Sequence, residues 1–332
     1  MVKFLTKETQ IFKNVIENHD SIVLFTHVNP DGDAIGSLFG LFQYLKLNYP
    51  SKKIRYAIDK LSKEIISFFE FTDEYIFNPD KNNDSKFLAI VLDVNVKQRV
   101  KNYNYLALAD KILVVDHHLK SEKENEINSD YLILFEKSIA TSELLSFMIY
   151  NLHSENSEKH QINNKTAKSL FYGIITDSNR FLYKNTNSLT FFISYFLSSF
   201  NFNLNEVYQL IYNRHYNEIS LMAYIQQNFL WEDTNFVSFF LDEKIYTKFN
   251  VPYSKAKNFS FVFNNITEID FWVFWSIDPV TKLYSVSLRS KKTPIHKIAL
   301  KFGGGGHELA AGVKLKSKPE VMSLIREIKK LC

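Results

Sequence analysis

Cysteine is nearly absent from this chain: one residue, Cys332, is found among 332. A single cysteine excludes a disulfide framework within one chain, and it excludes a zinc site built from several cysteines. Such low cysteine usage is typical of proteins from reducing compartments. We therefore expect a cytoplasmic protein.

Long apolar runs are missing as well. No uncharged apolar run approaches about 18 residues, the length that would indicate a membrane-spanning helix. The most aromatic stretch, residues 189–202, is interrupted by serine and asparagine. The first 20 residues carry charges throughout and lack the apolar segment of a signal peptide. The sequence predicts neither membrane insertion nor export.

The net charge is small, +4, and by itself favours no class of partner. Its distribution along the chain is uneven. Residues 216–332 hold 16 Lys and Arg against 11 Asp and Glu, whereas residues 1–215 hold 24 against 25. A basic C-terminal part beside a slightly acidic N-terminal part suits an anionic ligand. An ordinary solvated surface is the alternative explanation of the same counts.

The order of apolar runs predicts an α/β fold in the N-terminal part. Apolar runs at residues 21–26, 52–58, 87–94 and 111–115 alternate with helical patterns such as 34–47, 141–152 and 166–176. Strands that are apolar throughout and alternate with helices are typical of a parallel sheet covered on both faces. The length of the chain fits two domains.

The pattern changes toward the C-terminus. Residues 188–228 read as helical, contain no Gly or Pro, and are predicted to link a domain at 1–187 to a domain at 229–332. Short β-like runs follow from residue 235, then a helix at 293–301, the sequence FGGGGHELAAG, a last strand and a helix at 319–331. We expect a smaller α/β domain here, with a cleft between the two domains.

Two groups of aromatic residues could either stack on nucleic-acid bases or fill a core. They are Phe271, Trp272 and Trp275 in a β-like run, and Phe191, Phe192, Tyr195 and Phe196 in the linking segment. Alternation along the β-like run favours the core for the first group. We expect the same for the second.

Acidic residues and histidines gather where four predicted elements end. The clusters are HVNPDGD at 27–33, VLDVN at 91–95, VVDHH at 114–118 and TDSNR at 176–180. The carboxyl ends of parallel strands meet at one edge of a sheet, so clusters far apart in sequence converge there. Carboxylates and imidazoles without thiolates suit Mn²⁺, with Mg²⁺ or Co²⁺ as alternatives.

So many carboxylates in one crevice would repel one another unless cations were bound. One ion cannot use all of these groups. Two ions bridged by a carboxylate can, and they would hold an attacking water and polarise a phosphoryl oxygen. Each cluster also has an ordinary structural interpretation: Asp31 and Asp33 could cap a helix, and His117 and His118 could be a solvated pair. The coincidence of all four clusters favours the two-metal site.

Four consecutive glycines at 303–306, followed by His307, form a candidate anion site. Glycine reaches positive φ and lets backbone N–H groups approach an anion closely. A flexible turn is the alternative. Arg289 lies upstream in a strand-like run, where its guanidinium could pair with a phosphate.

These motifs carry a family resemblance. HVNPDGDAIGS, VLDVN, VVDHH and GIITDSNRF resemble the four motifs of the DHH phosphoesterase superfamily, and SLRSKKTPIHKIALKFGGGGHELAAG resembles the signature of the DHHA1 domain that often follows. The match spans nearly the whole chain in the expected order. It looks closest to stand-alone DHH–DHHA1 proteins of the NrnA type. Those are nano-RNases that remove mononucleotides from very short oligonucleotides, and many also dephosphorylate 3′-phosphoadenosine 5′-phosphate.

The resemblance implies a role for each matched residue. The implied metal ligands are His27, Asp31, Asp33, Asp93, His117 and Asp177. Asp93 would bridge two divalent ions, one of them held with His27 and Asp31. His118 would face the substrate phosphate or the leaving oxygen, Asp116 would orient His117, and these two with Asp93 form the implied catalytic group.

Substrate contacts are implied in both parts of the chain. The implied substrate-binding residues are Arg99, Arg289, Ser290, Gly304, Gly305, Gly306 and His307. One departure from the family pattern is Asn179, followed by Arg180, where a small glycine is expected. It touches no implied ligand but could change access or substrate preference.

The resemblance implies a metal-dependent phosphodiesterase or exonuclease acting on short RNA or DNA oligonucleotides or on small nucleotides, with no membrane partner and with a homodimer left open. The nearest alternative is a phosphodiesterase of cyclic di-AMP or of linear pApA. A non-catalytic nucleotide-binding protein would predict a damaged ligand set. A family II inorganic pyrophosphatase would lack the glycine-rich signature, and a RecJ-like exonuclease would need a longer chain.

Overall fold

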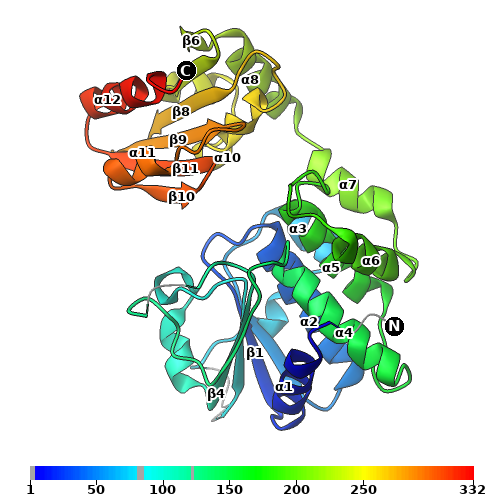
Figure 1. Ribbon diagram of the computed structural model, residues 1–332. Coiled ribbons are helices and arrows are strands. Elements are labelled where there is room, and N and C mark those ends of the chain that lie inside the picture. The colour runs from blue at the N-terminus through cyan, green and yellow to red at the C-terminus, as the bar shows by residue number, and fades with distance from the viewer. Residues whose placement is uncertain (1–3, 81–85, 121–122) are drawn as a thin grey trace. The chain divides into compact units, whose positions relative to one another are not determined.

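The computed structural model describes residues 4–80, 86–120 and 123–332, with the side chain of His307 excepted (Figure 1). The chain divides into two compact units, Met1–Tyr212 and Asn213–Cys332. Among the helices of the described ranges, none combines the length and the apolarity that crossing a bilayer requires.

The first unit is built on a five-stranded parallel sheet with the order β2-β1-β3-β4-β5. Its strands are β1 (Ser21–Phe25), β2 (Lys53–Ala57), β3 (Leu88–Leu92), β4 (Lys111–Asp116) and β5 (Tyr131–Leu134). β1 and β3 are buried along their whole length, as expected where both faces of a parallel sheet are covered. The α/β prediction is confirmed. β5, a partly exposed edge strand, is an addition that the sequence pattern does not predict.

The two faces of this sheet are covered differently (Figure 1). The longer helices lie on one face: α1 (Thr6–Glu17), α2 (Gly32–Asn48), α4 (Thr141–Glu155) and α5 (Asn164–Asp177). The short α3 (Lys63–Phe69) packs on the same side. On the other face, the connection between β3 and β4 contains only 3₁₀ turns, including Tyr103–Leu108, and it contributes Leu106 to a second apolar cluster.

Glycines allow α2 and α5 to cross at close range. A Cβ at Gly36 would lie 2.7 Å from backbone atoms of Gly173, and a Cβ at Gly173 would lie 2.9 Å from Oδ1 of Asp33. Neither position can hold a side chain without moving a helix, because interiors are close-packed. Donor atoms of Asp33, near the start of α2, and of Asp177, the last residue of α5, lie within 4.8 Å of each other.

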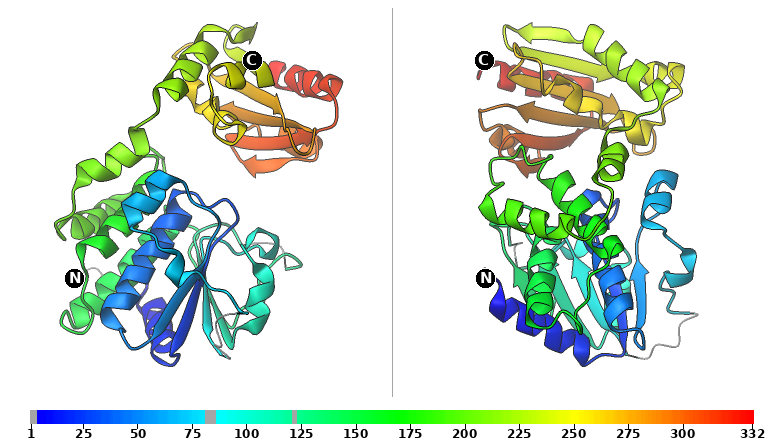
Figure 2. Two further views of the ribbon diagram at one scale, coloured as in Figure 1. Left: turned by 180° about the vertical axis from the view of Figure 1, so that it is seen from behind. Right: turned by 90° about the vertical axis from the view of Figure 1, so that its right-hand side faces the viewer.

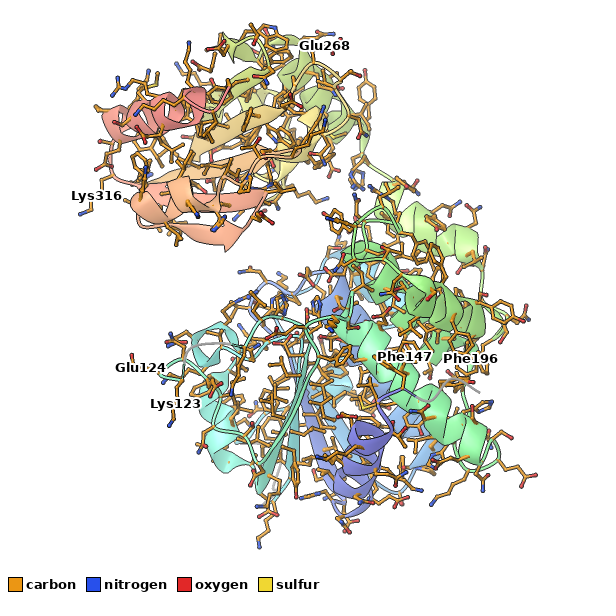
Figure 3. All side chains as sticks on the ribbon, in the orientation of Figure 1. Lys123, Glu124, Phe147, Phe196, Glu268 and Lys316 are labelled. Atoms are coloured by element: carbon orange, nitrogen blue, oxygen red, sulfur yellow. The ribbon has the colours of Figure 1, made fainter. Side chains whose placement is uncertain are left out.

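Two further helices, α6 (Ser188–Ser198) and α7 (Leu204–Tyr212), belong to the first unit. The rings of Phe192 and Phe196 pack edge-on against Tyr150 of α4, with centroids 5.2 and 4.9 Å away. Phe147 and Phe196 are both found in this helical layer in Figure 3. The core interpretation is therefore right for two of the four aromatic residues of the segment.

For the other two aromatic residues of α6 the core interpretation is wrong. Phe191 and Tyr195 are 54% and 74% exposed. They lie four residues apart and so share one face of the helix, which is turned away from the buried residues Thr190, Ile193, Ser194 and Leu197. The third aromatic-rich helix of the region, α8 (Tyr216–Gln227), belongs to the second unit.

The second unit contains a six-stranded sheet with the order β10-β11-β9-β8-β7-β6 (Figure 2). The strands are β6 (Leu230–Asp233), β7 (Phe236–Leu241), β8 (Phe271–Ile277), β9 (Tyr284–Ser290), β10 (Gly305–His307) and β11 (Ala310–Leu315). β7 and β8 are parallel, and the other neighbours are antiparallel. The glycine-rich run is thus partly a strand.

Helices pack on both faces of this mixed sheet. α11 (His296–Lys301) and α12 (Lys318–Lys329) cover one face. α11 begins later than the helix predicted from residue 293, because Pro294 disfavours helical geometry at the residue before it. The other face is covered over β7 and β8 by α8, α9 (Glu243–Lys248), α10 (Tyr253–Ala256) and the 3₁₀ turn Phe259–Phe263. Phe271, Trp272 and Trp275 are buried, which confirms the core interpretation for that group.

Candidate metal centre

The predicted clusters lie together at the carboxyl edge of the parallel sheet. His27 lies two residues after β1, Asp93 directly follows β3, and His117 directly follows β4. Asp177 ends α5. Strand order reverses between β1 and β3, the position at which open α/β sheets commonly bind ligands.

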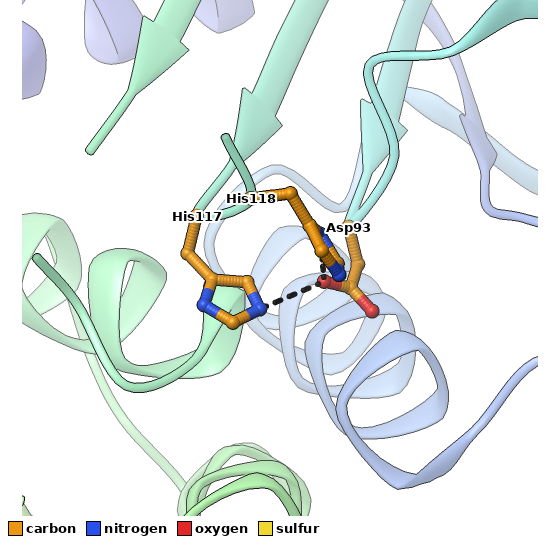
Figure 4. Close-up of side chains that lie close together, drawn as sticks. All are labelled: Asp93, His117 and His118. Atoms are coloured by element: carbon orange, nitrogen blue, oxygen red, sulfur yellow. Dashed lines mark ion pairs between the residues drawn. The ribbon is translucent and has the colours of Figure 1, made fainter. Parts of the chain in front are cut away.

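Asp93 lies at the centre of the group. It is 1% exposed, and its backbone has a φ of 61°, a left-handed conformation that is uncommon outside glycine. Its Oδ2 lies 3.6 Å from Nε2 of His27, and its Oδ1 lies 3.6 Å from Nε2 of His117. Figure 4 shows the rings of His117 and His118 beside this carboxylate. One carboxylate therefore faces two sets of donors with different oxygens.

The donor atoms of the described residues form three groups, one of which, Asp93 with His117 and His118, joins the other two. Within each group, one donor atom from each of three residues lies within 4.8 Å of the others. The other two groups are His27, Asp31 and Asp93, and Asp33, His117 and Asp177. The structure thus brings together all six residues named as ligands from the sequence, and the cluster could bind metal.

His27 supplies direct support for a cation. Its Nδ1 lies 3.0 Å from the carbonyl oxygen of Val28, which can only accept, so Nδ1 carries the hydrogen. Its Nε2 is buried and has no hydrogen-bond partner among the described residues. The carboxylate oxygens of Asp31 and Asp93 lie 3.7 and 3.6 Å away. A buried, unpaired nitrogen facing two carboxylates fits a cation that all three would ligate.

The pKa values of the cluster also support a cation site. Burial, and then the Asp33 carboxylate, raise the pKa of Asp93 well above its ordinary range. Burial, with the charges of Asp33 and Asp31, raises the pKa of Asp177 from 3.8 to about 8. Burial disfavours the imidazolium of His27, but the carboxylates of Asp31 and Asp93, which lie 3.7 and 3.6 Å from its Nε2, raise its pKa from 6.5 to about 10. Without a cation the cluster therefore retains protons, which bound metal would displace.

Asp31 has a second role in the fold. Its Oδ1 accepts hydrogen bonds from the backbone N–H groups of Asp33 and Ala34, at 3.2 and 3.1 Å, and so caps α2. The helix-cap interpretation of this segment and its place beside His27 are therefore both correct.

Asp116 contacts His118, whereas the sequence-based expectation paired it with His117. Its Oδ1 accepts from Nδ1 of His118 at 2.8 Å and from the His118 backbone N–H at 3.1 Å. Asn95 donates to its Oδ2 at 2.6 Å. Although burial opposes it, the hydrogen bonds from His118 hold the pKa of Asp116 below its ordinary value. The reason for the correction is alternation at a strand end, which turns residues i and i+2 to one side.

A segment that sequence reasoning did not single out holds two of the carboxylates. The backbone N–H groups of Thr141 and Ser142, in the first turn of α4, donate to Oδ2 and Oδ1 of Asp33 at 2.6 and 2.9 Å. The Thr141 hydroxyl donates to Oδ1 of Asp93 at 3.1 Å. Backbone donors leave no side-chain signature, and the only signal was a Thr-Ser pair at the start of a predicted helix.

The cationic residues named for substrate lie in different units. Arg99 is exposed at the end of the 3₁₀ turn Lys97–Arg99, and its carbonyl accepts from the N–H of Val28 at 2.7 Å. Arg99 is therefore close to the loop that carries His27. In the second unit, Nη1 of Arg289 donates to the carbonyl oxygens of Leu288 and Ala311 at 2.8 and 3.1 Å.

The remaining substrate candidates surround the glycine-rich strand. Ser290 is buried and donates its hydroxyl to the Thr293 carbonyl. Gly304 and Gly306 pack on β11, where a Cβ at Gly306 would lie 2.6 Å from the Ala310 carbonyl oxygen. A Cβ at Gly305 would meet nothing within 4 Å. For His307 the structure describes the backbone and not the side chain.

Comparison with known proteins identifies the family. The family model of the N-terminal domain of the DHH family matches residues 21–174, and that of the DHHA1 domain matches residues 236–332. A Bacillus subtilis protein named bifunctional oligoribonuclease and PAP phosphatase NrnA is 30% identical over 318 residues, 96% of each chain. A protein of the same name from Mycoplasma pneumoniae is 28% identical over 321 residues, 96% of this chain and 94% of the relative.

A solved structure shows the same fold over the full length. It is an exopolyphosphatase-related protein from Bacteroides fragilis, with a TM-score of 0.83 and 23% identity, covering 100% of this chain and 99% of that one. Both domain matches fall in the order seen in the structure, one on each compact unit. With a relative at 30% identity aligned almost from end to end, this chain belongs to the DHH/DHHA1 family of phosphoesterases.

Proposed function

We propose that the protein is a two-metal phosphodiesterase that hydrolyses short oligonucleotides to mononucleotides and also converts 3′-phosphoadenosine 5′-phosphate to AMP. The observation that carries this proposal is the position of Asp93, whose two oxygens face two separate donor groups. Relatives that share almost the whole length of the chain are named as oligoribonuclease and PAP phosphatase.

The donor set divides naturally between two ions. His27, Asp31 and Asp93 would hold one, and Asp33, Asp93, His117 and Asp177 would hold the other. Mn²⁺ is the proposed ion, because the donors are carboxylates and imidazoles without sulfur. When bound, such ions polarise a phosphoryl oxygen and make a water available for attack near neutral pH.

His118 would serve the leaving group. Its Nδ1 is hydrogen-bonded to Asp116, so Nε2 is the ring nitrogen that can donate a proton. As water attacks phosphorus and releases one proton to the solvent, the bond to the departing ribose oxygen would break and that oxygen would take the proton from His118. The buried Asp116 carboxylate would orient the ring through this hydrogen bond.

The second unit would supply an anion-binding surface. Register places positions 289, 310 and 307 side by side across β9, β11 and β10. Gly312 and Gly305 pair two residues further along the same strands and are exposed, so the backbone there is accessible. The guanidinium of Arg289 beside small residues would bind a nucleotide phosphate. Arg99 would contact phosphate in the first unit.

A substrate screen of the purified chain with Mn²⁺ tests the proposal. The substrates are RNA and DNA di- to pentanucleotides, 3′-phosphoadenosine 5′-phosphate, linear pApA and cyclic di-AMP. We expect mononucleotides from the short linear RNAs and AMP from 3′-phosphoadenosine 5′-phosphate, read by chromatography. Hydrolysis of cyclic di-AMP in preference to every linear substrate, or no hydrolysis by a Mn²⁺-loaded protein, would contradict it.

Binding of Mn²⁺ near neutral pH is expected to release protons. Asp177, with a pKa of about 8, and His27, with a pKa of about 10, hold protons in the metal-free protein below those values. A cation requires the deprotonated forms, so the affinity for Mn²⁺ should fall as the pH drops below about 10 at the donor group of His27, and below about 8 at the donor group of Asp177. Calorimetry in buffers of different ionisation enthalpy measures the release, and a binding heat independent of the buffer would speak against this ligand set.

A further inference from the structure

Glu143 is a buried acidic residue without a role in the reaction described above. It is 3% exposed and forms no ion pair with a cation in the part of the chain that the structure describes. Its Oε2 accepts hydrogen bonds from the Ser138 hydroxyl and from the N–H of Ile139, the latter at 3.0 Å. Its Oε1 is buried and has no hydrogen-bond partner among the described residues. Burying a carboxyl group in this way is unfavourable, which points to a role beyond local packing.

The loop that Glu143 fastens holds a proposed metal ligand. The carbonyl oxygen of Ser138 lies 3.2 Å from Nδ1 of His117. Because a carbonyl can only accept, this contact places the hydrogen on Nδ1 and leaves the lone pair of Nε2 facing Asp33, Asp93 and Asp177. The position of one peptide group therefore sets the orientation and the tautomer of His117.

The same short segment also fixes Asp33. α4 has Ala140 at its N-cap, and the alanine side chain cannot accept a hydrogen bond from the first turn. The N–H groups of Thr141 and Ser142 are instead directed to both oxygens of Asp33. Residues 138–143, which we name the α4 platform, thus contact His117 through a carbonyl and Asp33 through two N–H groups. Glu143 closes this platform by binding its first two residues to the first turn of the helix.

We propose that Glu143 is a positioning residue for the donor group of Asp33, His117 and Asp177, acting through the α4 platform on the affinity for one of two divalent ions. The proposal rests on the two-metal function given above. A purely structural clamp would affect the stability of the fold alone, whereas a positioning residue also changes metal affinity and the tautomer of His117.

Three variants separate these possibilities. Glu143→Gln keeps an acceptor for the Ile139 N–H. Glu143→Asp keeps a carboxyl group but withdraws it by one methylene, and Glu143→Ala removes the acceptor altogether. Glu218→Ala is the matched control, because Glu218 is buried in the second unit and paired with Lys255 at 2.7 Å. Mn²⁺ binding to the full chain is measured by calorimetry, and the imidazole ¹⁵N shifts of His117 are measured in the metal-free protein.

We expect Glu143→Ala and Glu143→Asp to weaken binding of one Mn²⁺ by roughly 10- to 100-fold, the usual effect of losing a residue that orients a ligand. Glu143→Gln should restore most of the affinity, and Glu218→Ala should leave it unchanged. The ¹⁵N shifts of His117 should report a single Nδ1–H tautomer in the wild type and a mixture in the Asp and Ala variants.

Wild-type affinity for both ions in the Asp and Ala variants, with only a lower melting temperature, would overturn the proposal. If Glu143→Ala does not fold, the test rests on Glu143→Asp alone. Wild-type Mn²⁺ affinity in Glu143→Asp would then also overturn the proposal. Failure of the wild type to bind Mn²⁺ would remove the proposed function instead. In that case the ¹⁵N shifts in the metal-free protein still decide whether Glu143 positions His117.

Discussion

Asp93→Asn is expected to lower kcat for phosphodiester hydrolysis by about 10⁴-fold, because one substitution weakens both donor groups and loses several kcal/mol of transition-state stabilisation. Asparagine is the informative replacement. It has the shape of aspartate and tolerates the left-handed backbone at this position, where φ is 61°. The loss should therefore come from ligation and not from a distorted strand end.

Although Asp93→Asn is expected to lose activity, the thermal stability of the metal-free variant should not fall. Burial and the Asp33 carboxylate raise the pKa of Asp93 in the folded protein. A carboxyl whose folded pKa is raised contributes stability at low pH and loses it as the pH rises through that pKa, so at neutral pH its charge opposes folding. Metal-free Asp93→Asn should melt at or above the temperature of the metal-free wild type, and added Mn²⁺ should no longer raise its melting temperature as it does that of the wild type.

Asp20→Asn is the control, since the Asp20 side chain is fully exposed at the opposite end of β1. It should match the wild type in kcat and in its thermal response to Mn²⁺. Near wild-type turnover by Asp93→Asn, or a full thermal response of that variant to Mn²⁺, would remove Asp93 from the centre of the site.

His118→Ala is expected to lower kcat on oligonucleotides by about 10²- to 10⁴-fold, the range for loss of a general acid. Mn²⁺ affinity should change little, because the Nδ1 of His118 is hydrogen-bonded to Asp116. A substrate that does not need leaving-group protonation distinguishes this role. Hydrolysis of bis-p-nitrophenyl phosphate releases p-nitrophenolate, a stabilised anion that needs no proton to leave. The variant should therefore retain most of its activity on this substrate.

The competing possibility is that His118 is a metal ligand, since its Nδ1 also lies 3.6 Å from Oδ1 of Asp93. In that case the variant would lose Mn²⁺ affinity and would be impaired equally on both substrates. His117→Ala provides the comparison, because Nε2 of His117 faces Asp177 at 3.3 Å. Loss of this imidazole should weaken Mn²⁺ binding and lower activity on both substrates.

The central strands and the polar residues at their ends could be predicted because the same physical constraint produces both. A parallel strand buried on two faces must be apolar throughout, as β1 and β3 are. Polar ligands can then be placed only where the strand ends, and His27 and Asp93 are found there. β5 escapes this reasoning because an edge strand is partly exposed, and a short mixed run such as YLIL does not separate strand from loop.

Other features depend on contacts that the sequence does not record. The α4 platform acts through backbone N–H and carbonyl groups, which every residue carries, so Thr141 and Ser142 show no special pattern. The division of the α6 aromatics between core and surface depends on where Tyr150 presents its ring. The partner of Asp116, by contrast, can be predicted from the sequence, because alternation along β4 places residues 116 and 118 on one side.

The crossing of α2 and α5 sets the spacing between two proposed ligands, and side-chain movement cannot adjust that spacing. Where two helices meet through Gly36 and Gly173, the spacing between Asp33 and Asp177 is fixed by main-chain contact, which neither compresses nor changes rotamer. In a library of random substitutions, these two glycines should therefore be as intolerant of replacement as the ligands, although neither can touch an ion or a substrate. A redesign of the site should therefore keep both glycines unchanged, as it keeps the proposed ligands.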